Sequence, residues 1–198
     1  MIEVEKKFEI EKSKLEKLLE GANFVGEKSI TDSYYDNSSY SLTLNNIWLR
    51  KRDGKFQLKL PTKEEAENPT SLFEKFHELE TDEEIAKHFG WKLTDSSLEE
   101  LLLSHEYKPF TEFISNRRKY RKGDFIIDID STNFGYNIME VELLVDDGSM
   151  LQEAQDRIKE FADTFSLEIK YIRGKLIELL YRKNREHFNA LVKAGIVK

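Results

Sequence analysis

The sequence of 198 residues contains no cysteine and only three prolines. The lack of cysteine excludes a disulfide framework, a thiolate zinc site and a cysteine nucleophile. No apolar run approaches the ~20 residues that a membrane helix requires, and the charged start Ile2-Glu3-Val4-Glu5 lacks the apolar stretch of a signal peptide. We therefore expect a cytoplasmic protein that has no membrane partner.

Motifs of phosphate-binding loops and zinc hydrolases are absent as well. The sequence has no Walker motif and no G-x-G-x-x-G, and none of its four histidines belongs to an H-E-x-x-H motif. The formal net charge of −7 also counts against a general nucleic-acid partner. If the protein binds phosphate groups, side chains rather than a glycine-rich loop must hold them.

Charged residues, in contrast, are abundant. Lys, Arg, Asp and Glu make up 35% of the sequence, against ~25% in an average domain. A hydrophobic content of 39% and an aromatic content of 12% exclude a disordered chain. The length suits one domain with its own core, which we place at residues 1–198 and expect to be a monomer.

Eight segments alternate apolar and polar residues with a period of two, or are rich in β-branched and aromatic residues, which is typical of strands. They are Ile2–Ile10, Thr31–Asp36, Ile47–Asp53, Lys55–Leu60, Leu72–Glu80, Thr111–Tyr120, Asp124–Ser131 and Asn137–Val145. Asp53-Gly54 predicts a tight hairpin, and strands joined by short turns are antiparallel. We therefore expect an α+β fold: a closed, eight-stranded antiparallel β-barrel with peripheral helices.

Helix starts are indicated by capping boxes, in which a hydroxyl and a carboxylate three residues later bind free backbone amides. Such boxes predict helices that begin at Ser13, Thr81 and Ser96. Apolar residues on one face predict a helix over Met150–Phe165, capped by Ser149, and another over Ile172–Val192. The acidic run Glu64–Glu67 is expected to be solvated surface.

The polar faces of several strands carry charges of one sign. Side chains two apart on a strand point the same way, so Glu3, Glu5 and Lys7 share one face of the first strand. The same spacing joins Arg50 with Arg52, Asp128 with Asp130, and Glu140 with Glu142. Like charges at such positions repel. Sorted signs therefore favour a binding site, while a charged face in water stays the alternative for any single strand.

This chemistry suits one class of ligand. Mg²⁺ and Mn²⁺ prefer carboxylate and water oxygens, whereas arginine forks and lysine ammonium groups bind phosphate oxygens. The two sets together predict a site for a polyphosphate bound with Mg²⁺ or Mn²⁺. A calcium-storage protein fits less well, because the usual loop with a glycine at a fixed position is missing from the sequence.

Glu3-Val4-Glu5-Lys6-Lys7 resembles the E-x-E-x-K signature of the CYTH, or triphosphate tunnel metalloenzyme, superfamily. Further matches follow in order: Arg50-Lys51-Arg52, Lys59, Arg117, Asp128-Ile129-Asp130, Glu140-Val141-Glu142 and Lys175. Longer stretches, such as Trp48-Leu49-Arg50-Lys51-Arg52 and Asn133-Phe134-Gly135-Tyr136, are similar to the animal thiamine triphosphatases within it. The resemblance implies a barrel whose tunnel is lined by acids and bases.

The resemblance also implies roles for single positions. Asp128, Glu140 and Glu142 would hold Mg²⁺, the first two also next to the substrate, and Glu3 and Glu5 would hold a second metal or the attacking water. The triphosphate would be bound by Lys7, Arg50, Arg52, Lys59, Arg117 and Lys175, with Lys59 also counted as catalytic beside Glu3 and Glu5. Trp48 would stack on an aromatic part of the substrate; its alternative is a core residue of the barrel wall. Lys175 reaches the site only if the last helix docks at the barrel mouth.

The function implied by the resemblance is metal-dependent hydrolysis of thiamine triphosphate to thiamine diphosphate and phosphate, with this small-molecule triphosphate as the partner. Inorganic tripolyphosphate needs no aromatic contact and is the main alternative substrate. Adenylate cyclisation is a further alternative within the superfamily. A non-catalytic triphosphate-binding module on the same barrel is the alternative from a different functional class.

Overall fold

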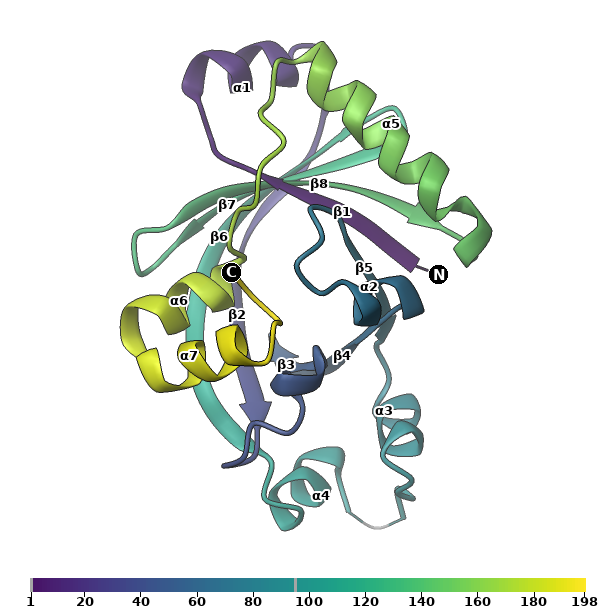
Figure 1. Cartoon of the computed structure of the whole chain (residues 1–198), viewed down its shortest axis with the longest axis vertical. Helices are drawn as coiled ribbons and strands as arrows, with labels where there is room; N and C mark the ends of the chain where they lie inside the picture. The colour runs from purple at the N-terminus through teal and green to yellow at the C-terminus, as the bar shows by residue number, and fades with distance from the viewer. Residues whose placement is uncertain (1, 95) are drawn as a thin grey trace.

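The computed structural model describes residues 2–94 and 96–198 and forms a closed β-barrel of antiparallel strands (Figure 1). The strands are β1 (Ile2–Phe8), β2 (Asn23–Asp36), β3 (Trp48–Arg52), β4 (Lys55–Pro61), β5 (Glu74–Leu79), β6 (Lys108–Lys122), β7 (Phe125–Thr132) and β8 (Asn137–Val145). Around the barrel they follow the order β1-β5-β4-β3-β2-β6-β7-β8, and β8 closes onto β1. The eight predicted strands and the predicted barrel are thus confirmed.

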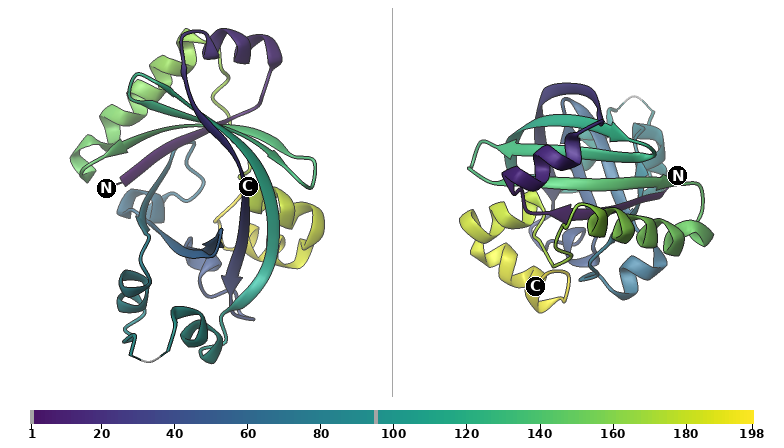
Figure 2. Two further views of the ribbon diagram at one scale, coloured as in Figure 1. Left: turned by 180° about the vertical axis from the view of Figure 1, so that it is seen from behind. Right: turned by 90° about the horizontal axis from the view of Figure 1, so that it is seen from above.

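The longest strands are β2 and β6, with 14 and 15 residues, and they pair along most of their length. Figure 2 shows both curving along the height of the molecule. The sequence predicted only the second half of β2, since most of the stretch from residue 23 to 29 is exposed on both faces and lacks the alternation of a half-buried strand. A register shift between Phe24 and Gly26 further interrupts the pattern there.

The helices lie around the outside and at the ends of the barrel (Figure 1). They are α1 (Lys12–Leu19), α2 (Lys63–Glu67), α3 (Asp82–His88), α4 (Leu98–Ser104), α5 (Leu151–Thr164), α6 (Lys175–Lys183) and α7 (Arg185–Lys193), with 3₁₀ turns η1 (Thr43–Asn45) and η2 (Gly148–Met150). Within residues 2–94 and 96–198, none of these helices combines the length and the apolar character that crossing a membrane requires.

Only one of the predicted helix caps is confirmed in place, that of Thr81 on α3. The capping box of α4 is formed by Ser97 and Glu100, one residue later than predicted, and Ser97 has the extended backbone of a cap. The prediction of a cap at Ser13 was wrong, since α1 begins at Lys12 without a side-chain cap. Ser149 lies inside η2 and does not cap α5.

A single helix over Ile172–Val192 was also predicted, and this was wrong. The chain breaks into α6 and α7 at Asn184, whose backbone leaves the helical region with φ −139° and ψ 78°. The Asn184 side chain accepts a hydrogen bond from the His187 backbone N–H, and such local bonds compete with helix continuation. The two helices therefore fold back on each other beside the barrel, and α6 begins at Lys175.

Apolar packing lies mainly on the outer surface of the barrel. The outward residues of β1, β7 and β8, such as Val4, Ile127 and Val141, pack against Ile158 of α5 in one cluster. A second cluster joins the outer faces of β3 and β4 to α3 and α4. A third lies at the barrel mouth, where α6 and α7 pack with Phe113 of β6 and with Trp48. The alternate residues of the strands are thereby left to line the interior.

Candidate functional site

The barrel encloses a cavity of about 140 Å³. All the predicted site residues except Asp128 line it, namely Glu3, Glu5, Lys7, Trp48, Arg50, Arg52, Lys59, Arg117, Glu140, Glu142 and Lys175. Asp128 is 1% exposed and ion-paired to Arg117. The strand alternation read from the sequence therefore brings acids and bases from several strands into one space.

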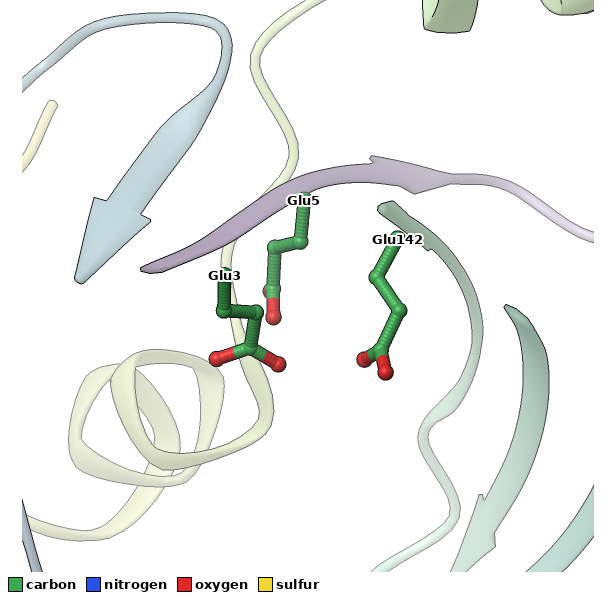
Figure 3. A group of neighbouring side chains, drawn as sticks. All are labelled: Glu3, Glu5 and Glu142. Atoms are coloured by element: carbon green, nitrogen blue, oxygen red, sulfur yellow. The ribbon is translucent and has the colours of Figure 1, made fainter. Parts of the chain in front are cut away.

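Three carboxylates converge on one side of the cavity (Figure 3). Glu3 and Glu5 project from β1 and Glu142 from β8, and one oxygen of each lies within 4.8 Å of the others. Glu5 and Glu142 are register partners across the β1–β8 pair. Oxygen donors at this spacing are suited to a hard divalent cation.

In this acid trio (Glu3, Glu5 and Glu142), the pKa values of Glu142 and Glu3 are shifted in opposite directions. Burial raises the pKa of Glu142 to about 9, and the nearby charges of Glu3 and Glu5 add to the rise. No ion pair to Glu142 occurs within the described part of the chain. Burial also acts on Glu3, but the adjacent Lys59 ammonium outweighs it and lowers the pKa of Glu3. The raised pKa of Glu142 reflects the cost of placing its charge beside Glu3 and Glu5, and a bound cation would offset that cost.

A second cluster of acids, formed by Asp128, Asp130 and Glu140, is ion-paired with Arg117 and Lys175. Arg117 reaches Asp130 with Nε and Nη2 at 2.7 and 2.6 Å, reaches Glu140 at 2.9 Å, and also contacts Asp128. Lys175 Nζ lies 2.7 Å from Glu140. Burial opposes ionisation of Glu140, yet Lys175 and Arg117 hold its pKa well below the usual range. Glu140 and Glu142, only two residues apart on β8, therefore have pKa values shifted in opposite directions.

Asp128 nevertheless retains one free oxygen. Its Oδ1 is buried and has no hydrogen-bond partner among the described residues. Burial raises the pKa of Asp128, although Arg117 and Lys119 act against the rise. A buried carboxylate oxygen without a donor is costly, and a metal ion is one group that would satisfy it.

The remaining cavity cations pair with Glu3 and Glu5 and also with three acids that the sequence analysis did not single out, namely Asp32, Glu74 and Glu78. Lys7 pairs with Glu5 and with Glu74, the latter at 2.5 Å, and Lys59 pairs with Glu3. Arg52 binds Asp32 through two contacts of 2.7 and 2.8 Å, and Arg50 binds Glu78 at 2.9 Å. The signal for Glu74 and Glu78 was present, because they share the inward face of β5 at a spacing of four residues.

The mouth of the cavity is less charged. Trp48 lies here, its indole Nε1 donating to Asn46 Oδ1 at 2.9 Å. Leu176 and Ile177 of α6 complete this wall together with Ile196 and Val197 after α7. The docking of α6 at the mouth also brings Lys175 into the cavity, which the sequence left conditional.

The acidic run Glu64–Glu67 was expected to be solvated, and for Glu65 this was wrong. Glu65 is 1% exposed and lines the cavity, because α2 lies against β5 and turns this side chain inward. The helix is a little over one turn long and has no apolar periodicity from which its buried face could have been predicted.

Known proteins resemble the chain over nearly its full length. Human thiamine-triphosphatase is 25% identical over 209 residues, which cover 98% of this chain and 91% of the human protein. A structure of a Pyrococcus horikoshii OT3 protein is 22% identical, covers 91% of this chain and 99% of its own, and has a TM-score of 0.66. A Hippeastrum protein, described as having a dominant triphosphatase activity, is 16% identical over 91% and 95% of the two chains, with a TM-score of 0.56.

The two structures support the barrel fold, and the match to a family model also identifies the family. The model of the CYTH domain matches residues 1–172, from the start of β1 to just before α6. This range contains the acid trio and every predicted site residue except Lys175. The chain therefore belongs to the CYTH family.

Proposed function

We propose that this protein hydrolyses thiamine triphosphate to thiamine diphosphate and phosphate with the help of Mg²⁺ or Mn²⁺. CYTH proteins are metal-dependent triphosphatases and cyclases. The observation that carries the proposal is an acid trio whose carboxylate oxygens lie within 4.8 Å of one another, facing a cavity lined with arginine and lysine. Thiamine triphosphate as the substrate is supported by the likeness to the human enzyme.

Glu3, Glu5 and Glu142 would hold the divalent cation. The raised pKa of Glu142 and the unpartnered Oδ1 of Asp128 both fit a site that takes up positive charge. When bound, the cation would neutralise phosphate oxygens and favour ionisation of water. Asp128 and Glu140, which the resemblance also implies as ligands, are engaged by Arg117 and would become available if Arg117 turned to the substrate.

The chain's own cations would position the triphosphate. Phosphoryl transfer depends mainly on alignment and on neutralising the charge of the transferring oxygens. Arg50, Arg52 and Lys59 come from the β3–β4 hairpin, and Arg117 comes from β6, which is separated from β3 by β2. Cations from three strands would thus bind the anionic substrate, and Lys59, already beside Glu3, would neutralise the leaving diphosphate.

The attacking water would be oriented by the acids of β1. Glu3 and Glu5 point into the cavity from alternate positions of one strand, and Lys59 keeps Glu3 ionised at neutral pH. An ionised carboxylate accepts a proton or holds a water by hydrogen bonds. Trp48 at the mouth offers a ring face to the thiazolium, which is a cationic aromatic group.

Parallel hydrolysis rates on thiamine triphosphate, tripolyphosphate and ATP test the proposal. We expect thiamine triphosphate to have the highest kcat/KM with Mg²⁺, and EDTA to abolish its turnover. Full activity in EDTA would refute metal assistance, and a preference for tripolyphosphate would assign the alternative substrate. Binding of all three without turnover would indicate a non-catalytic module. Glu153→Gln on the exposed face of α5 is the matched control for Glu142→Gln, which should be inactive.

A further inference from the structure

Residues 167–174 form the linker that connects α5 to α6 (Figure 1). The first part of this linker lies outside the barrel, where Leu167 and Ile169 pack in the apolar cluster of β1 and α5. Its later part lies inside, since Tyr171 lines the cavity. The α5–α6 linker therefore passes from the outer surface of the barrel to the inner one at Lys170.

Lys6 of β1 binds the linker at this crossing point. Its Nζ donates a hydrogen bond of 2.6 Å to the backbone oxygen of Lys170. Lys6 is 2% exposed, and no carboxylate forms an ion pair with it within the described part of the chain. Burial lowers the pKa of Lys6 to about 8, and the positive charge of Lys7 adds to the fall. The ammonium group is thus buried with a backbone carbonyl as its partner.

The apolar surroundings make this burial of Lys6 costly. Lys6 shares the outer face of β1 with Val4 and Phe8, which belong to the cluster packed against α5. A charged group among apolar side chains opposes folding, and the flexible apolar side chain of a methionine would suit such a position. The role of Lys6 therefore lies in the linker that it binds rather than in the packing of the core.

The other end of the linker leads directly into the cavity. Tyr136 Oη donates to the backbone oxygen of Arg173 at 2.7 Å and so binds the linker a second time. Two residues later, Lys175 begins α6, and its Nζ lies 2.7 Å from Glu140. The path of the linker thus determines where the Lys175 ammonium group enters the cavity.

We propose that Lys6 is a positioning residue for Lys175: by fixing the linker where it crosses into the barrel, it keeps the Lys175 ammonium in the cavity to bind the triphosphate. The effect on substrate rests on the proposed function. Lys6 acts from the outer face of β1, whereas its neighbour Lys7 lies on the inner face and lines the cavity. Because Lys6 binds a backbone carbonyl, it controls the path of the linker independently of the linker side chains.

Chemical acetylation of lysine amines, measured by mass spectrometry, tests the position of Lys175 without any substrate. Lys175 is 8% exposed and ion-paired, so it should react slowly in the wild-type protein. In Lys6→Met the linker should open more often, and we expect Lys175 to react about tenfold faster, as for the loss of a hydrogen bond from a charged donor. Lys87→Met removes the same charge from the exposed surface of α3 and should leave the rate unchanged.

Two further measurements separate positioning from a role in stability. Methionine removes a buried charge from an apolar environment, so Lys6→Met should unfold at a Tm equal to or above that of wild type. With Mg²⁺, its KM for thiamine triphosphate should rise about fivefold, with a smaller change in kcat. A lower Tm without a change in KM would assign Lys6 to the core and overturn the inference.

An unchanged acetylation rate of Lys175 in Lys6→Met would also overturn the inference, whether or not the protein hydrolyses triphosphates. Absence of turnover in the wild-type protein would instead refute the proposed function, and the acetylation result would still decide the role of Lys6. If Lys6→Met fails to fold, Tyr136→Phe keeps the ring and removes the second bond to the linker. It should raise the acetylation rate of Lys175 several-fold, and a wild-type rate would refute the control of Lys175 by the linker.

Discussion

Glu5 on β1 and Glu142 on β8 lie directly opposite each other in the barrel wall. Opposed like charges destabilise a pair of strands. Asp128 and Glu140 are opposed in the same way across β7 and β8, but Arg117 contacts both of them. Glu5 pairs with Lys7 and lies 3.8 Å from Lys59, whereas Glu142 has no ion pair within residues 2–94 and 96–198, so Glu142 is the member of this pair that lacks a positive partner.

The metal-free protein should lose stability through Glu142 as the pH rises. Its pKa is about 9 in the folded state against 4.5 for the ordinary group, so folding retains a proton that the unfolded chain releases. The contribution is complete below pH 4.5 and is lost as the pH rises to about 9. Glu142→Gln removes this dependence.

We therefore expect Glu142→Gln in EDTA to gain in Tm relative to wild type between pH 5 and pH 9. Each kcal/mol corresponds to about 2–4 °C for a chain of this size. Thermal unfolding followed by circular dichroism measures the difference, with Glu153→Gln as the exposed control. A difference in Tm that stays constant over this pH range would contradict the prediction.

Arg117→Met should destabilise the metal-free protein by about 3–5 kcal/mol, because it leaves three buried carboxylates without their common cation. Urea unfolding in EDTA measures the loss. Arg118→Met is the control, since the neighbouring Arg118 is exposed on the other face of β6 and should change stability by less than about 0.5 kcal/mol. Equal stability of the two variants would show that Arg117 does not organise this cluster.

Gly174→Ala should weaken substrate binding with little effect on stability. A Cβ at Gly174 would lie 3.2 Å from Lys7 Cε, and the backbone there is one that alanine can adopt. The new methyl group would shift the Lys7 ammonium away from Glu5 and Glu74, raising KM for the triphosphate about fivefold, or ~1 kcal/mol. Steady-state kinetics of Gly148→Ala, where no atom lies within 4 Å, supply the comparison; matching KM values would rule out this steric effect.

Trp48→Ala should lower kcat/KM for thiamine triphosphate about 2- to 30-fold, which corresponds to ~0.5–2 kcal/mol for a cation–π contact. Tripolyphosphate has no ring, so its turnover should fall less. Trp48→Phe retains an aromatic face and should recover part of the loss. If alanine and phenylalanine have the same effect, or if thiamine triphosphate turnover is unchanged in Trp48→Ala, Trp48 belongs to the barrel wall only.

Much of the tunnel lining was predictable because a strand has a fixed period. Glu3, Glu5 and Lys7 had to share a face, and they share the inner one. The Asp53-Gly54 hairpin was also clear, since both residues adopt the positive φ that such a turn requires.

Partners within the lining were not predictable in the same way. Which acid meets Arg117 depends on β6, β7 and β8 being neighbours in this register, a property of the assembled barrel. The buried position of Glu65 depends on how a five-residue helix packs. The break at Asn184 results from a single side chain competing for the backbone, which an apolar pattern with helical spacing does not reveal.

The outer placement of the apolar clusters has a consequence for how this barrel can change. Two of the apolar clusters lie on the outer surface of the strands, against α3, α4 and α5, and the opposite surface lines the cavity. Of two neighbouring positions on a strand, the outer one therefore contributes to apolar packing and the inner one to the chemistry of the cavity. Substituting an inner acid together with the cation that pairs with it leaves the outer apolar packing unchanged. The same barrel fold can therefore carry a cavity with a different charge pattern, suited to another anion.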